Sequence, residues 1–272
     1  MERKITSSSN SLIKHVKSLH RKKARWKSAN YFVEGLKAVE EGLISKADIE
    51  FFLYSDALFD INGGCELFDE IKNFENAYNI PDKLLNEISD TENPQGIIAV
   101  VKFKLSSLKD VVLKNNNFLV ILDELRDPGN MGTIIRTADA LGANGIVVTK
   151  GCVDVFNPKT IRSTMGSIFH IPLAFEGDIE DIIASLKKEE IKIISTSLES
   201  SDYCYNIDFK QDFALIIGNE ASGVSDRVIE ISDYSTKIPM KGEAESLNAA
   251  IASGIVMYEA SRQRQDCKKM QI

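Results

Sequence analysis

The sequence predicts an α/β protein, with a mostly parallel sheet in its C-terminal part and a smaller α/β domain before it. Three observations lead to this prediction: a length of 272 residues, short apolar runs after residue 117, and helical patterns between those runs. A chain of this length buries a hydrophobic core without disulfide bonds. Alternating strands and helices are typical of a parallel sheet covered on both faces, and ligands of such sheets bind beyond the carboxyl ends of the strands.

Residues 1–28 form a basic arm on an otherwise acidic chain. The whole chain carries a net charge of −7, yet residues 1–27 hold nine Lys or Arg against one acidic residue, a local charge of +8. The rest of the chain therefore carries −15. This distribution favours contact between the arm and a nucleic acid, because cations that meet phosphates release counterions on binding. The candidate contacts are Arg21, Lys22, Lys23 and Arg25.

The arm also has an alternative interpretation as a helix packed on the protein. Apolar residues recur in it at helical spacing, and its rings could stack either on bases or inside the protein. Both interpretations can hold at once. The apolar residues are Leu12, Ile13, Val16 and Leu19, and the rings are those of His15, His20 and Trp26.

Residues 29–104 alternate short apolar runs with helical patterns, which predicts a small α/β domain. The polar segment 104–117 ends in three Asn residues, and we expect a domain boundary there. The runs are, in order, YFVEG, LKAVEEGLI, IEFFLY, a Gly-Gly turn at 63 and 64, ELFDEIKNF, KLLNEI and GIIAVVKF.

Residues 118–264 form the second expected domain. Its short runs are β-branched and apolar along their whole length, as strands buried on both faces should be. Helical patterns separate them. The expected strands are 118–123, 145–148, 191–196, 213–218 and 235–240.

Four cysteines, at positions 65, 152, 204 and 267, are far apart in the sequence. Their spacing matches neither a zinc site nor a disulfide framework, so we expect reduced thiols. The start, MERKITSSSN, lacks the apolar run of a secretion signal, and no stretch has the length that spans a bilayer. We expect a soluble cytoplasmic protein.

The first cluster of unusual residues is DELRDPGNMGTIIRTADALGANG, residues 123–145, directly after an expected strand. Asn130 is a candidate cap for the helix that follows the Pro-Gly turn. Arg136 lies two residues after Ile134, about 200° round the helix, and so should point away from the core. Its planar fork suits a phosphate or carboxylate, although an ion pair with Asp139 is the simpler interpretation.

The second cluster is GNEASGVSDRV, residues 218–228, again directly after a strand. Gly218 and Gly223 allow close backbone approach or a positive φ, while Ser225 can cap a helix. Glu220 is a carboxylate at a strand end that such a turn does not explain. In the first cluster, the glycines of DPGNMG do not match the G-x-G-x-x-G fingerprint, so an enzyme that uses a nicotinamide cofactor is disfavoured.

The third cluster is IPMKGEAESLNAAIASGIVMYEASRQR, residues 238–264. Pro239 ends a strand, and a helix is expected to begin near Ser246, where Ser246 and Asn248 would lie in the first turn. One stripe of this helix predicts packing against another element. The stripe consists of Leu247, Ala250, Ile251, Gly254, Ile255 and Tyr258.

Together the three clusters closely resemble the sequence motifs of the SpoU (TrmH) family of RNA ribose 2′-O-methyltransferases. The resemblance covers residues 118–264 in the family's order, with the strings DPGN-x-GTIIRTADALGA, IIGNEASGVS and IPMKGEAESLN. The stretch NPKTIRSTMGSIFHIP also looks like the family's sequence between the first two motifs. FVEGLKAVEEGL and TENPQGIIAVV look like the substrate-binding domain that many members carry.

The resemblance implies a trefoil knot of the SPOUT type, a homodimer, and S-adenosylmethionine as methyl donor. It also implies which residues form the site in this sequence. The donor should lie among Thr196, Gly218, Ile238, Met240 and Leu247, and the reaction site should be formed by Asn130, Arg136, Glu220, Ser246 and Asn248.

The expected reaction is methylation of a ribose 2′-hydroxyl in RNA. Arg136 stands where the family places its catalytic residue, but a guanidinium keeps its proton above pH 12. We therefore hypothesise that Arg136 holds the adjacent phosphate and stabilises the developing alkoxide. Ribosomal RNA is preferred over transfer RNA, because the N-terminal domain resembles that of family members that act on the large ribosomal subunit.

One alternative from another class is an RNA-binding ribosome assembly protein that keeps this fold without chemistry. A metal-dependent hydrolase is disfavoured, because His15, His20 and His170 lack the spacing of metal ligands.

Overall fold

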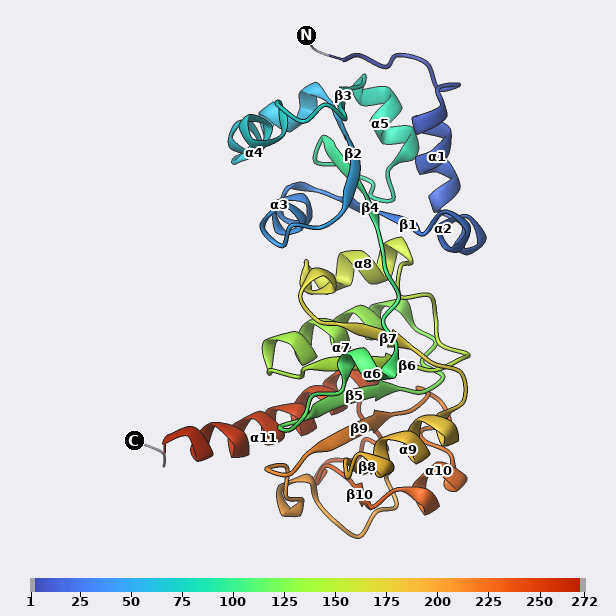
Figure 1. Cartoon of the computed structure of the whole chain (residues 1–272), viewed down its shortest axis with the longest axis vertical. Coiled ribbons are helices and arrows are strands. Elements are labelled where there is room, and N and C mark those ends of the chain that lie inside the picture. The colour runs from blue at the N-terminus through green and yellow to red at the C-terminus, as the bar shows by residue number, and fades with distance from the viewer. Residues whose placement is uncertain (1–2, 270–272) are drawn as a thin grey trace. The chain divides into compact units, whose positions relative to one another are not determined.

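The computed structural model describes the backbone of residues 3–269 and the side chains of residues 3–265; Cys267 lies outside the latter. The chain divides into two compact units (Figure 1). Unit 1 comprises Met1–Lys104 and Asp154–Phe169, and unit 2 comprises Leu105–Val153 and His170–Ile272. Among the described residues, no helix combines the length and apolar character needed to cross a membrane.

Unit 1 is built on a mixed sheet with the strand order β1-β4-β2-β3. β4 pairs antiparallel with both β1 and β2, and β2 pairs parallel with β3. Apolar residues at alternate positions of β2 and β4 face one side of this sheet, where α1 and α5 cover them. The elements are β1 (Asn30–Glu34), α3 (Leu36–Ile44), β2 (Ile49–Tyr54), η1 (Asp56–Asp60), α4 (Gly64–Ile71), β3 (Ala77–Asn79), α5 (Asp82–Ile88) and β4 (Ile97–Lys102).

The basic arm is part of unit 1 and forms two helices, α1 (Ser11–Leu19) and α2 (Lys22–Ser28). Asn10 caps α1 by accepting a hydrogen bond from the backbone N–H of Leu12. Ile13, Val16 and Leu19 are fully buried in the core of unit 1. The packing interpretation of the arm is therefore correct for α1.

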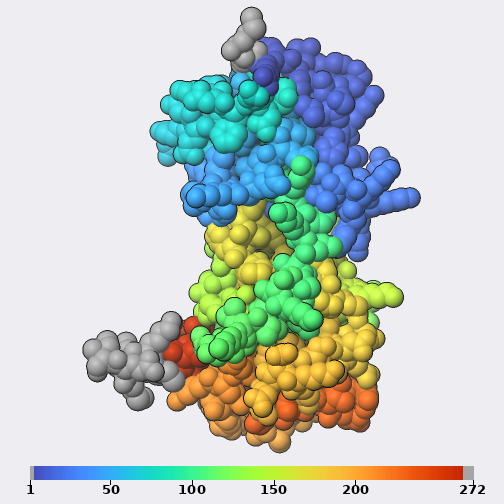
Figure 2. All heavy atoms as spheres, in the orientation of Figure 1, coloured from blue at the N-terminus to red at the C-terminus, as the bar shows by residue number. Residues whose placement is uncertain are grey.

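Residues 154–169, here called the inserted segment, belong to unit 1 although they fall inside the range 118–264. The segment holds α8 (Pro158–Thr164) and η2 (Ser167–Phe169), and α8 packs against β1. In Figure 2 its yellow atoms lie against the blue atoms of the N-terminal part of unit 1. The chain therefore passes between the units three times, after Lys104, Val153 and Phe169.

Unit 2 contains a six-stranded sheet with the order β10-β8-β9-β5-β6-β7, and every pair of neighbours is parallel. The predicted parallel sheet is thus confirmed. Its elements are α6 (Leu108–Val111), β5 (Phe118–Leu122), α7 (Pro128–Ala140), β6 (Gly145–Val148), β7 (Leu173–Phe175), α9 (Ile179–Lys188), β8 (Lys192–Thr196), η3 (Cys204–Asn206), β9 (Phe213–Ile217), α10 (Asp226–Ile231), β10 (Tyr234–Thr236) and α11 (Ala249–Lys269).

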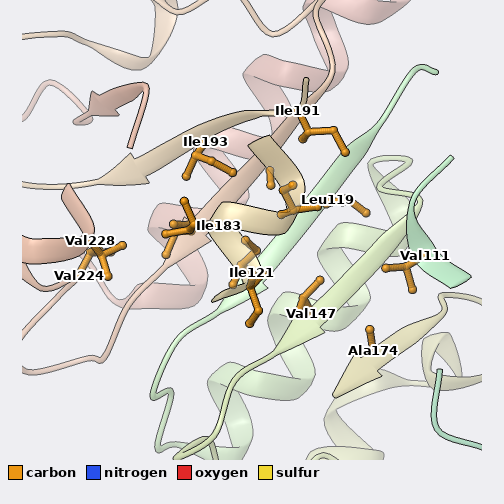
Figure 3. Packing of buried hydrophobic residues seen from close by; sticks show 14 residues of the cluster. Val111, Leu119, Ile121, Val147, Ala174, Ile183, Ile191, Ile193, Val224 and Val228 are labelled. Carbon is orange, nitrogen blue, oxygen red and sulfur yellow. The ribbon is translucent and has the colours of Figure 1, made fainter. Parts of the chain in front are cut away.

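One face of this sheet is covered by α9 and α10. Leu119 and Ile121 of β5 and Ile193 of β8 pack there against Ile183 of α9 and Val228 of α10 (Figure 3). On α7, Ile134, Ile135 and Ala138 are fully buried, as expected for this helix, and α11 packs against α7.

Four elements differ from the sequence expectation. β3 and β7 have only three residues each, and an apolar run of that length is too short to predict a strand. The strand expected at 235–240 spans only Tyr234–Thr236 and so ends before Pro239, which cannot donate to a sheet ladder. The segment 104–117 contains the short helix α6, held by a capping box between Ser107 and Asp110.

Candidate active site

The three motif loops leave neighbouring strands at the same edge of the sheet in unit 2. The first loop follows β5, the second follows β9, and the third follows β10, while Thr196 ends β8. These four strands are consecutive in the order β10-β8-β9-β5 and run parallel, so their carboxyl ends lie together. Ligands bind at such an edge.

The first loop enters α7 through Asp127 and Pro128. Asp127 is the N-cap, and its carboxylate accepts a hydrogen bond from the backbone N–H of Asn130 at 2.8 Å. The expectation that Asn130 caps this helix is therefore wrong. Proline at the first helical position with Asp before it is a favoured helix start, and this signal was available in the sequence.

Glu220 of the second loop binds the first loop through both carboxylate oxygens. Oε2 accepts a hydrogen bond from the backbone N–H of Arg126 at 3.0 Å. Oε1 accepts from the backbone N–H of Asp127 at 2.9 Å and from Nδ2 of Asn130 at 3.1 Å. The sequence could not predict the two backbone donors, because every residue except proline has a backbone N–H group.

Asn130 joins this contact to the third loop. Its Oδ1 accepts a hydrogen bond from Nδ2 of Asn248 at 2.9 Å. Asn248 in turn accepts at Oδ1 from the backbone N–H groups of Ala250 and Ile251. Glu220, Asn130 and Asn248, here called the three-residue network, thus connect all three motif loops.

The position of Asn248 corrects the expected helix start. α11 begins at Ala249, and Asn248 acts as its cap, so neither Asn248 nor Ser246 lies in the first turn. Ser246 is exposed, and its hydroxyl makes no hydrogen bond within the part of the chain that the structure describes. The fold brings Asn130, Glu220 and Asn248 into contact but gives Ser246 no partner in unit 2.

The surroundings of Glu220 favour its ionised form. Partial burial by itself would raise the pKa of this carboxyl, but the N–H groups of Arg126 and Asp127 and the amide of Asn130 outweigh it. The pKa of Glu220 is therefore lowered. An ionised carboxylate with three donors bound to it is suited to holding loops in place, and poorly suited to taking a proton.

Arg136 is exposed on α7, away from the core, as the helical spacing predicted. The alternative pair with Asp139 is not formed; Oδ2 of Asp139 lies 2.9 Å from Nδ1 of His170 instead. Among the described residues Arg136 has no ion-pair partner. Its guanidinium can therefore meet an anionic ligand.

The residues expected near a methyl donor follow three adjacent strands. Thr196 ends β8, and its hydroxyl donates to the backbone oxygen of Ile216. Ile238 is partly exposed two residues after β10, and Met240 and Leu247 are each 37% exposed in a loop without regular structure. This edge thus offers apolar side chains and unpaired backbone groups together.

Gly218 meets the backbone of its own loop. A Cβ at Gly218 would lie 2.3 Å from the carbonyl carbon of Gly223, so no larger residue fits. Gly223 has a φ of +69°, as expected, and exchanges two backbone hydrogen bonds with Asn219. Ser225 caps α10, also as expected.

Asn219 is a further residue that sequence reasoning missed. Its Nδ2 donates to the backbone oxygen of Glu124, and its Oδ1 accepts from the N–H groups of Ala221 and Ser222. It therefore shapes the second loop and fastens it to the first. An Asn at a turn is a common signal for such bonds, and Asn219 directly precedes Glu220.

The stripe predicted to pack on α11 is mostly exposed in the chain. Ile251 is 55% and Tyr258 is 61% exposed, whereas Ser253, Met257 and Ala260 on another face are fully buried. The expected stripe thus forms an apolar outer face. Its exposed members are Leu247, Ile251, Ile255 and Tyr258.

The four candidate RNA contacts in the arm have different surroundings. Arg21, Lys22 and Lys23 are exposed. Arg25 is 2% exposed and pairs with Asp154, so its guanidinium cannot meet a phosphate. Trp26, His15 and His20 lie against Phe103, Phe51 and Phe32 inside unit 1.

No group of three His, Cys, Asp or Glu side chains among the described residues is arranged to hold a metal ion.

Comparison with known proteins identifies both parts of the chain. The SpoU rRNA Methylase family matches residues 117–258, and the MRM3-like substrate binding domain matches residues 10–99. The chain is 35% identical over 259 residues to the 23S rRNA (guanosine(2553)-2'-O)-methyltransferase RlmP of Bacillus subtilis, covering 94% of this chain and 98% of that protein.

Two solved structures show the same fold. The AdoMet-bound rRNA methyltransferase from Sinorhizobium meliloti has a TM-score of 0.85 and 33% identity, over 96% of this chain and 97% of that one. The SpoU methyltransferase AviRb from Streptomyces viridochromogenes in complex with AdoMet has a TM-score of 0.84 and 29% identity, over 94% and 98%. This chain therefore belongs to the SpoU rRNA methylase family.

Proposed function

We propose that the protein transfers a methyl group from S-adenosylmethionine to a ribose 2′-hydroxyl of ribosomal RNA. The observation that carries this proposal is the three-residue network, which joins the three motif loops at one edge of the sheet. The relatives named above, which methylate 23S rRNA or are bound to AdoMet, support the same reaction and cofactor.

The residues at this edge fit the methyl donor. Apolar side chains of Ile238, Met240 and Leu247 suit the adenine, and the backbone groups of the loop after β10 are outside any strand or helix. Thr196 and Gly218, at the ends of the adjacent strands β8 and β9, complete the set that would hold it. When bound, the cofactor supplies an activated methyl group on a sulfonium.

The protein's own contribution is alignment and charge. Arg136 binds the phosphate beside the target ribose with its bidentate fork and stabilises the oxygen as it loses its proton to solvent. Glu220 stays ionised and holds the first loop through its three donors. Asn130 and Asn248 fix the relative position of the first and third loops, and the exposed Ser246, two residues before Asn248, contacts the ligands.

A methyl-transfer assay with purified protein and a 23S rRNA fragment tests the proposal. Ribose methylation at one nucleotide, absent without S-adenosylmethionine, is the expected result. Arg136→Lys should lower kcat/KM about tenfold or more at every pH between 6 and 9, because an ammonium cannot copy the fork. Nearly full activity in this variant would refute the role given to Arg136.

The functional form is a homodimer formed through the apolar outer face of α11. Ile251, Ile255 and Tyr258 recur there at intervals of four and three residues, and Leu247 extends the row toward the third loop. Four large apolar side chains exposed in a row are typical of a protein interface. An interface on this face brings the partner subunit close to the third loop of the active site.

Unit 1 acts as the substrate-binding domain, and its exposed Arg21, Lys22 and Lys23 contact the RNA backbone. Residues 1–28 serve as part of that domain, and the catalytic domain spans 118–264 apart from the inserted segment. A positive charge concentrated in the arm, on an otherwise acidic chain, supports this division of work.

The third loop and α11 form a trefoil knot. Its support is the strand order, in which β9 lies between β8 and β5 and α11 returns from the edge strand β10 to pack on α7. The place of action is the cytoplasm. Three unpaired cysteines, Cys65, Cys152 and Cys204, are compatible with a reducing compartment.

A further inference from the structure

A buried ion pair joins α2 to the inserted segment within unit 1. Arg25 donates to Oδ2 of Asp154 from Nε at 2.8 Å and from Nη2 at 2.5 Å. Its third donor, Nη1, binds the backbone oxygen of Leu19 at 2.6 Å. The two side chains are only 2% and 4% exposed.

The second carboxylate oxygen of Asp154 is also occupied. Oδ1 accepts from Nε1 of Trp26 at 3.0 Å and from the backbone N–H of Phe156 at 3.3 Å. The ring of Phe156 stacks on Phe103 at 4.0 Å, and Trp26 meets both rings edge-on. Asp154 therefore has a donor on each side and aromatic rings around it.

Such a pair is a costly way to stabilise a core. Both charges lose their hydration, and apolar side chains of similar size often stabilise a protein as well or better. What the pair adds is a unique geometry, because the planar fork of Arg25 bonds only in one orientation. That geometry fixes the rotation of α2, a helix of only seven residues.

The rotation of α2 decides where its cations point. Lys23 and Lys27 lie two residues on either side of Arg25, so each is about 160° from it around the helix. Both are exposed, as are Arg21 and Lys22 at the start of the helix. Turning Arg25 inward therefore turns Lys23 and Lys27 outward.

We propose that the Arg25–Asp154 pair positions α2 for RNA, so that Arg21, Lys22, Lys23 and Lys27 meet the phosphate backbone in one fixed arrangement. Arg25 is then a positioning residue that never touches RNA. The proposal rests on the proposed function of unit 1. It also assigns a role to the inserted segment, which supplies Asp154 and thereby holds α2. The chain joins this segment at both ends to unit 2, the unit that contains the candidate active site.

The test compares RNA binding by the wild type and by the double variant Arg25→Met/Asp154→Leu. This variant removes both charges together, whereas a single substitution would leave one buried charge without a partner. Thermal unfolding and circular dichroism show that it is folded. The control is Lys72→Met, which breaks an exposed pair with Asp69 on α4 of the same unit.

We expect the double variant to bind S-adenosylmethionine within twofold of the wild type by calorimetry. Its Kd for a 23S rRNA fragment should rise about tenfold, and the slope of log K against log salt should fall, because fewer phosphates are neutralised at once. Lys72→Met should match the wild type in all these measurements. A folded double variant with unchanged RNA affinity and salt slope overturns the proposal.

If the double variant does not fold, the single variant Arg25→Lys tests the positioning role of the Arg25–Asp154 pair. The ammonium still pairs with Asp154 but cannot also reach the oxygen of Leu19, so α2 loses its fixed rotation, and we expect a weaker salt slope. A wild-type slope in Arg25→Lys contradicts the proposal, as does absence of RNA binding by the wild type. Intact RNA binding without methyl transfer counts against the proposed reaction alone.

Discussion

Asn248 donates a hydrogen bond from Nδ2 to Oδ1 of Asn130 at 2.9 Å, across 118 residues of sequence. The bond has a fixed direction. Oδ1 of Asn248 is occupied by the first N–H groups of α11, and Nδ2 of Asn130 is occupied by Glu220. Neither amide can therefore turn over without placing a donor against a donor or an acceptor against an acceptor.

Asn248→Asp tests this bond while keeping the helix cap. The new carboxylate still accepts from Ala250 and Ile251, and Asp is as good a cap as Asn. The carboxylate of Asp at position 248 has no N–H group to donate to Oδ1 of Asn130, so two acceptor oxygens face each other. We expect kcat/KM to fall about tenfold or more, since a lost bond with an unmet partner costs about 1–3 kcal/mol. An unchanged Tm with wild-type kcat/KM would contradict this role for Asn248.

Glu220→Gln tests the carboxylate that holds the first loop. The amide keeps one acceptor, but its N–H₂ group faces a backbone donor, so amide hydrogen exchange at Arg126 should become faster than in the wild type. The pKa of Glu220 is lowered in the folded protein, so its contribution to stability is present above the unfolded value of 4.5 and is lost as the pH falls through the folded value.

The pH dependence supplies a second measurement on the same variant. The difference in the free energy of unfolding between wild type and Glu220→Gln should be constant above pH 5 and shrink on acidification below 4.5. A difference that grows on acidification would show that the pKa of Glu220 is raised. Glu220 could then take a proton during the reaction.

Much of unit 2 could be predicted from the sequence because its signals are local. The apolar runs at 118–123 and 145–148 become β5 and β6, and helical spacing correctly turned Arg136 outward. The pairing of these strands and the contacts among their loops are not local. Glu220 and Asn130 are 90 residues apart, and no spacing rule connects them.

Two predictions from the sequence were wrong: Arg25, expected to contact RNA, is buried, and Ile251, expected to pack within the chain, is exposed. A charged residue in a basic helix normally faces water, and nothing near Arg25 indicates a carboxylate 129 residues away. An apolar stripe on a helix equally predicts packing inside the chain or against another chain. Ile251 lies on such a stripe and is 55% exposed, because α11 packs on its own chain through another face, which includes Ser253, Met257 and Ala260.

Gly218→Ala should disable the second loop. The added Cβ would lie 2.3 Å from a backbone carbon of Gly223, and backbone atoms there cannot move aside without moving Glu220. We expect a loss of stability of about 1–3 kcal/mol and a fall in kcat/KM greater than tenfold. Gly177→Ala is the matched control, since a Cβ there meets nothing within 4 Å. Equal activities in the two variants would show that the loop adapts.

Ile251→Glu should separate the subunits of the proposed dimer. In a two-fold interface through α11 the substitution occurs twice, and each copy loses apolar burial and gains a charge that must be desolvated. Together these effects amount to about 3 kcal/mol or more per dimer, roughly a hundredfold in Kd. Sedimentation equilibrium should give twice 30.2 kDa for the wild type and a value near 30.2 kDa for the variant at micromolar concentration.

Ala184→Glu controls for added charge in the same unit, because Ala184 is exposed on α9 and lies outside the apolar outer face. It should remain dimeric. If Ile251→Glu loses its activity together with its dimer, the third loop depends on the partner subunit. If the variant is a fully active monomer, the site is complete within one chain and the apolar outer face serves another purpose. A dimeric Ile251→Glu would place the subunit interface elsewhere on the protein.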